Sequence, residues 1–154
     1  MRVTVSLAGL AVALVLGPQL ALADLPDSRV DLHRDSYLPG QSVEFRLAND
    51  GLTPIVVLST APWKILDDRG KVVFYAVGLI DGCRTLLPGE SYGGDNQEWF
   101  RWNQRDNSGR TAAAGTYTAV VWFVDRATCP TPPLPPVSEH AERTATFRLL
   151  PDQF

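Results

Sequence analysis

Side chains that commonly carry out chemistry are sparse in this sequence. The 154 residues include two histidines and two cysteines, and His33 and His140 lie far apart along the chain. The sequence has no Gly-x-Ser-x-Gly elbow, no His-Glu-x-x-His pair, no Gly-x-Gly-x-x-Gly segment and no phosphate-binding glycine loop. A nucleophile, its base and the group that orients the base are hard to assemble from this set. We therefore predict that the protein is not an enzyme and uses no cofactor.

Two polar segments could be mistaken for metal sites. Asp67 and Asp68 are adjacent, so their carboxylates should point apart in a turn and be solvated. Residues 103–109 are rich in side-chain oxygen, but they lack the alternating acids and the distal bidentate glutamate of a calcium loop. We expect both segments to be turns and predict no metal site.

The first 23 residues have the pattern of a secretory signal peptide. Arg2 supplies a positive charge, residues 3–16 are almost continuously apolar, and the small-x-small site Ala21-Leu22-Ala23 precedes Asp24. Because the apolar run of roughly 14 residues is shorter than the ~20 that span a bilayer, we favour cleavage over a retained anchor. The prediction is an exported protein, periplasmic, cell-surface or secreted, with a single domain over residues 24–154 and no transmembrane segment after cleavage.

The charge of the mature domain argues against two classes of partner. The whole chain has 14 Lys and Arg residues against 17 acids, and Arg2 is the one charged residue of the leader, so the mature net charge is about −4. Nucleic acids and anionic membrane surfaces are bound by clustered positive charge. We predict a protein partner, a protease or an envelope protein, and no nucleic acid.

Export also changes how the two cysteines are interpreted. Cys83 and Cys129 lie 46 positions apart, and in an oxidising compartment a lone pair usually forms a disulfide. The chain-entropy model assigns a loop of this size roughly 4 kcal/mol of stabilisation. A reactive thiol or a metal site is the alternative, but neither cysteine has a second cysteine nearby, and His33 and His140 lie far apart in the sequence.

The elements that must position these residues are short strands. Val43, Phe45 and Leu47 alternate with polar neighbours, which is the period-two pattern of a half-buried strand. No window holds the spacing of an amphipathic helix, and twelve prolines and twelve glycines interrupt the chain. Further strands are expected at 54–58, 63–66, 72–75, 97–102, 117–124 and 144–149, separated by turns at 38–41, 67–70, 87–90 and 106–109. Such spacing predicts an all-β sandwich of about seven to nine antiparallel strands.

The strand at 117–124 is apolar on both faces, so we place it in the centre of a sheet. Tyr117 follows a Gly-Thr step at its start. A Gly-x-Tyr entering a late strand is typical of a tyrosine corner, in which the phenol hydroxyl bonds an upstream backbone group. The alternative is an ordinary core tyrosine without that bond.

The order of several segments resembles the intracellular proteinase inhibitor (BsuPI) family. These segments are Phe45-Arg46-Leu47-Ala48-Asn49, the hairpin at 67–70, Leu87-Pro88-Gly89-Glu90, then Trp102, Asp106, Gly109 and Ala114-Gly115-Thr116-Tyr117-Thr118. The resemblance covers residues 30–150 and implies an immunoglobulin-like sandwich and protease inhibition. An exported chain and a Cys pair with a proline-rich insert depart from the family pattern. No inhibitory residue is carried over from the family.

The proline-rich segment is the predicted binding loop. Residues 130–136 contain five prolines, which exclude them from a sheet ladder and favour an extended conformation. Residues 125–139 could present Arg126, Thr128 and Leu134 to the specificity pocket of a protease, with little entropy lost on docking. In the alternative, the prolines only shield a sheet edge.

A second hypothesis makes the domain an envelope adhesion or scaffolding module that inhibits nothing. This module would use exposed aromatic side chains, such as Tyr92 and Trp99, which could also stack on sugar rings in a glycan-binding variant. The other three tryptophans, Trp63, Trp102 and Trp122, are predicted to belong to the core because large aromatic side chains usually serve burial.

Overall fold

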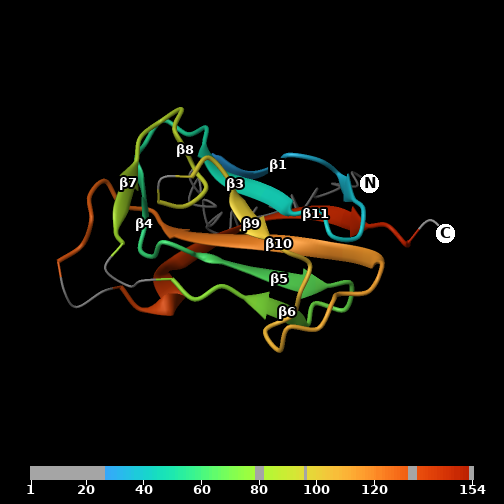
Figure 1. Cartoon of the computed structure of the whole chain (residues 1–154). Coiled ribbons are helices and arrows are strands. Elements are labelled where there is room, and N and C mark those ends of the chain that lie inside the picture. The colour runs from blue at the N-terminus through green and yellow to red at the C-terminus, as the bar shows by residue number, and fades with distance from the viewer. Residues whose placement is uncertain (1–26, 79–81, 96, 132–134, 153–154) are drawn as a thin grey trace, which may run out of the picture.

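The computed structural model describes residues 27–78, 82–95, 97–131 and 135–152, and it consists of two packed β-sheets (Figure 1). The first sheet contains β1 (Ser28–Leu32), β3 (Val43–Asn49), β8 (Ser91–Tyr92) and β9 (Phe100–Trp102). The second contains β2 (Ser36–Tyr37), β4 (Ile55–Val57), β5 (Trp63–Asp67), β6 (Val72–Tyr75), β7 (Arg84–Leu86), β10 (Gly115–Val124) and β11 (His140–Leu149). A short 3-10 helix, η1 (Val137–Glu139), precedes β11. The predicted all-β sandwich is therefore confirmed.

The two sheets differ in how their strands are ordered. In the first, β3 is central and pairs with β1 on one side and with β8 and β9 on the other. In the second, the order is β2-β11-β10-β4-β7, and β5 and β6 extend the sheet from β10. All described pairings are antiparallel except that of β2 with β11, which is parallel. The number of described strands, eleven, exceeds the predicted seven to nine because two-residue strands such as β2 and β8 are too short for a sequence period.

Strand β10 is the centre of the second sheet, as its two apolar faces predict. It pairs with β11 along its whole length, from Gly115 opposite Leu149 to Val124 opposite His140. Its other edge pairs with β5 and, at Val124, with β4. The last strand begins at His140, earlier than the predicted 144, because this ladder continues to the end of β10.

The core lies between the sheets and is rich in aromatic rings. Phe45 and Trp63 meet edge to face with ring centroids 5.1 Å apart, and Trp102 contacts Phe147 at 6.0 Å. Trp63 and Trp102 are both buried, as predicted. Trp122 is half-buried, and the prediction that it belongs to the core is wrong. Its neighbours Val121 and Phe123 point inward, so alternation turns Trp122 to the outer face of the sheet.

Turns lie where glycine was expected to permit them. Gly40, Gly70, Gly89 and Gly109 all have positive φ, between 75° and 85°. In the turn at 106–109, the Gly109 N–H donates to the Asp106 carbonyl at 2.9 Å. Among the described residues, Gln104 is the non-glycine residue with positive φ, at 59°, and its buried side chain donates to the carbonyls of Leu38 and Gln41.

The predicted tyrosine corner is present at the start of β10. The Tyr117 hydroxyl donates to the Ala113 carbonyl at 2.8 Å, which holds the strand against the segment that precedes it. Nearby, the Trp102 indole N–H donates to the Arg105 carbonyl at 2.7 Å. These bonds fix the connection between the two sheets.

The predicted signal peptide, residues 1–23, lies outside the described residues. Within the described ranges, no helix is long and apolar enough to cross a membrane.

Candidate functional site

The two acidic segments considered as metal sites form turns. Asp67 Oδ1 accepts hydrogen bonds from the Arg69 and Lys71 backbone N–H groups, so Asp67 caps its hairpin turn. In the turn at 106–109, the Asp106 carboxylate accepts hydrogen bonds from the backbone N–H and hydroxyl of Ser108 and from the backbone N–H and guanidinium of Arg110. No group of three or more His, Cys, Asp or Glu side chains in the described residues is placed to hold a metal ion.

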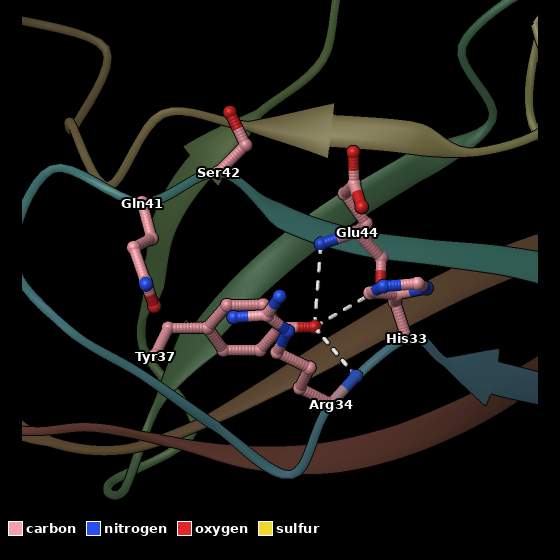
Figure 2. Close-up of a pocket in the computed structure, with 6 residues that line it drawn as sticks. All are labelled: His33, Arg34, Tyr37, Gln41, Ser42 and Glu44. Carbon is pink, nitrogen blue, oxygen red and sulfur yellow. Dashed lines mark hydrogen bonds between the residues drawn. The ribbon is translucent and has the colours of Figure 1, made fainter.

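A polar hollow of about 260 Å³ lies beside the connection between β1 and β2 (Figure 2). Its central group, the Tyr37 hydroxyl, accepts from the N–H groups of Arg34 and Glu44 at 3.2 and 3.4 Å and donates to the Glu44 carbonyl at 3.2 Å. Burial raises the pKa of Tyr37. Because this hydroxyl is saturated by backbone groups, it fastens the connection to β3 and is not presented to a ligand.

The aromatic pair predicted for adhesion is not an exposed platform. Tyr92 is 2% exposed, and its hydroxyl donates to the Asp95 carboxylate at 3.0 Å. Burial, reinforced by Asp95, raises its pKa. Trp99 is half-buried, with the Arg46 guanidinium 4.4 Å from its ring centroid and His33 edge-on at 5.4 Å. The prediction that Tyr92 is exposed is wrong. Tyr92 in β8 pairs with Leu47 of β3, and the Tyr92 side chain packs in the core.

The loop at residues 125–139 leaves the end of β10 and returns through η1 to β11 (Figure 1). Cys129 within it is bonded to Cys83, with a Cα–Cα distance of 5.9 Å, as the sequence predicts. Cys83 packs against a small second core of Val56, Leu58 and Val124. The disulfide therefore anchors an exposed loop to buried residues of β4 and β10.

An ion pair closes the same loop near its two ends. The Arg126 guanidinium lies 2.6 Å from the Glu139 carboxylate, thirteen residues later, and the Arg126 N–H donates to the Val124 carbonyl at 3.0 Å. Thr128 is exposed, whereas Leu134, the third predicted contact, lies outside the described residues. Of the three, the structure therefore places Arg126 and Thr128 on the anchored part of the loop.

A mostly apolar hollow beside this loop was missed by sequence reasoning. We call it the aromatic hollow; it has a volume of about 420 Å³ and is lined by Leu58, Tyr75, Val77, Trp122, Val137 and His140, among others. The Tyr75 and Trp122 rings are stacked, with centroids 5.4 Å apart. One signal in the sequence could have indicated it: the run VVFYAV at 72–77 is apolar at successive positions, so both faces of this strand carry apolar side chains. In the structure this strand, β6, lies at a sheet edge.

No protein-family model matches this chain, and a search of curated proteins finds no match. The resemblance to the proteinase inhibitor family accordingly rests on the segment order alone, and function has to be argued from the loop and the surface around it.

Proposed function

We propose that this chain is an exported, non-enzymatic binding domain that engages a protein partner through the loop at 125–139. The observation that carries the proposal is the combination of exposure and anchoring in that loop. Residues 125–129 are exposed, yet Cys129 is bonded to Cys83 and Arg126 is paired with Glu139. The disulfide also supports export, since such bonds persist in oxidising compartments.

Anchoring favours binding for an entropic reason. A free loop loses conformational freedom when it docks, and a loop already held in its bound shape loses less. Here the disulfide and the prolines at 130, 135 and 136 restrict the backbone before any partner arrives. The exposed segment 126–128 comes directly before the bonded Cys129, so its C-terminal side is held while its side chains stay open to a partner's cleft.

Protease inhibition is the specific form of this function that we propose, following the family resemblance. An inhibitor presents an extended segment to the substrate cleft, and Arg126 or Thr128 would enter the specificity pocket. The Arg126 and Glu139 side chains are both about half exposed, at 44% and 46%, so their ion pair is solvent-screened and costs little to open. The guanidinium can therefore exchange its intramolecular carboxylate for one on a partner.

The test uses the mature domain, residues 24–154, against a panel of serine, cysteine and metallo-proteases. We expect saturable inhibition by the wild type and its loss in a Cys83→Ala/Cys129→Ala variant and in a variant with residues 131–136 replaced by a Gly-Ser linker. Arg126→Ala should weaken inhibition, whereas Arg69→Ala, at another exposed arginine in the β5–β6 turn, should not. Circular dichroism of each variant is the control that checks whether its β fold is kept.

Absence of inhibition across the panel would remove the inhibitor form of the proposal. If the loop variants still bind an envelope protein, the loop is not the binding site, and the adhesion or scaffolding alternative is favoured. A glycan-binding face has lost its main support, because Tyr92 is buried.

A further inference from the structure

Arg126 is the one long side chain in the exposed segment between the end of β10 and the disulfide. That segment, residues 125–129, reads Asp-Arg-Ala-Thr-Cys, and each of its residues is exposed. A specificity pocket is filled by a side chain that reaches into it, and the Asp, Ala and Thr side chains beside Arg126 are short. The Arg126 side chain, which is 44% exposed, is therefore the part of this segment best suited to enter a pocket.

The backbone is held on both sides of Arg126. Two residues earlier, Val124 is 3% exposed and pairs with His140 of β11 and also with β4. The Arg126 N–H itself donates to the Val124 carbonyl at 3.0 Å. Three residues later, Cys129 is bonded to Cys83. Because the side chain projects from a short and restrained stretch, its docking orders few further backbone bonds.

The charge of the guanidinium determines which kind of pocket it can enter. Its Nη2 group bonds the Glu139 carboxylate at 2.6 Å, and no other hydrogen bond joins this side chain to the residues that the structure describes. Most of the five N–H donors of the arginine are therefore available to a carboxylate on a partner. An apolar pocket would bury the guanidinium without a counter-charge, which is costly, whereas a carboxylate at the base of the pocket compensates that burial.

Serine proteases have pockets of different chemistry: one type carries a carboxylate at its base, another is a hydrophobic slot, and a third is small. We propose that the partner is a serine protease of trypsin-like specificity, and that the Arg126 side chain fills its acidic pocket. The inference rests on the proposed function and names the specificity of the protease that the loop recognises. Glu139 holds the guanidinium until the carboxylate of the partner replaces it. Thr128, whose short side chain suits a small pocket, is the alternative contact.

The test compares the inhibition constants of the mature domain for trypsin, chymotrypsin and elastase, whose pockets are acidic, hydrophobic and small. We expect inhibition of trypsin to be about 100-fold or more tighter than that of the other two, because only its pocket pairs the buried charge. Arg126→Lys should keep the trypsin constant within about ten-fold, since the charge remains. Arg126→Leu should weaken trypsin inhibition about 100-fold or more and move the preference to chymotrypsin. The wild type should also displace p-aminobenzamidine, a fluorescent amidine, from the acidic pocket of trypsin.

The matched control is Arg69→Ala in the β5–β6 turn, which should change none of these constants. Thermal midpoints check that every variant is folded. Trypsin inhibition that Arg126→Leu does not weaken, or that leaves the amidine bound, would overturn the pocket assignment while the inhibitor function stands. A preference for elastase would overturn it in favour of Thr128, and inhibition confined to any other protease would overturn it as well. Absence of inhibition with every protease of the panel would remove the proposed function together with this inference.

Discussion

The two ends of β10 are held by different kinds of interaction. At its start, which we call the corner end, buried side chains bond backbone groups: Tyr117 to Ala113, Trp102 to Arg105, and Gln104 to the turn at 38–41. At its finish, the loop end, β4 pairs with β10 and β7, and the loop at 125–139 lies beside them (Figure 1). Here a disulfide joins Cys129 of the loop to Cys83, next to β7, and an exposed ion pair joins Arg126 to Glu139 within the loop.

The two kinds of interaction leave different groups exposed to solvent. Hydrogen bonds from buried side chains fix each backbone segment in one position and leave no polar group to a ligand. A disulfide restrains a loop with one covalent bond and leaves its other side chains exposed. The corner end therefore holds its backbone segments in place, whereas the Arg126 and Thr128 side chains at the loop end stay exposed.

The largest expected effect contrasts two tryptophans. Trp102→Ala should lower the free energy of unfolding by about 3–5 kcal/mol, since it empties a fully buried site and leaves the Arg105 carbonyl unpaired. Trp122→Ala, on the half-exposed face at the loop end, should cost about 1–2 kcal/mol. Urea denaturation of both variants measures the difference. Equal losses would mean that the loop end contributes as much to stability as the corner end does.

The second effect is removal of the disulfide. The Cys83→Ala/Cys129→Ala variant should lose up to about 4 kcal/mol, because the unfolded chain regains the freedom of a loop of this length. In hydrogen exchange, the amides at 125–139 should exchange faster because the loop opens locally. The amides of the corner end should exchange only through global unfolding, as they do in the wild type. Mass spectrometry of the wild type without reductant should find both thiols blocked from alkylation; two free thiols contradict the assignment.

The sequence predicted the corner end better than the loop end. Glycine turns, the period-two strands and Tyr117 are local signals, and each specifies its own geometry over a few residues. The partners of Gln104 could not be predicted, because its polar side chain indicates a surface position and its bonds to Leu38 and Gln41 span more than sixty residues.

The aromatic residues show a second limit of sequence reasoning. Alternation says which side chains share a face of a strand, but it does not say which face is inward when both are apolar. For that reason the pattern does not reveal that Trp122 lies on the outer face. Tyr92 is buried, and its two-residue strand β8 is too short for alternation to indicate this. The aromatic hollow requires β6, β10 and η1 to meet in space. The apolar run at 72–77 indicates apolar side chains on both faces of β6, but it does not say which elements lie beside them.

A smaller effect tests the tyrosine corner by itself. Tyr117→Phe should lower the free energy of unfolding by about 1–2 kcal/mol, since it removes the hydroxyl and leaves the ring in place. The value should lie near the lower limit, because Ala113 is exposed and water can replace the lost donor. Tyr75→Phe is the matched control at the loop end, where the ring is 49% exposed. Identical thermal midpoints for wild type and Tyr117→Phe would show that the corner bond adds nothing.

The smallest expected effect concerns the pH dependence of the turn at 106–109. Hydrogen bonds from the Ser108 hydroxyl first, and then from the Arg110 backbone and guanidinium, hold the pKa of the Asp106 carboxyl well below its usual range. A carboxyl whose pKa is lower in the folded state stabilises the fold above the unfolded value of about 3.9, and this contribution is lost as the pH falls through the folded value. Asp106→Asn should therefore be less stable than wild type at about pH 7, with a gap that narrows below about pH 4. Carbon-13 NMR titration of wild type and Ser108→Ala tests the cause directly, because loss of the first donor should raise the pKa of Asp106. A stability gap that is the same at both pH values would mean that the carboxylate charge has no role in the turn, and the corner end would then depend on neutral hydrogen bonds alone.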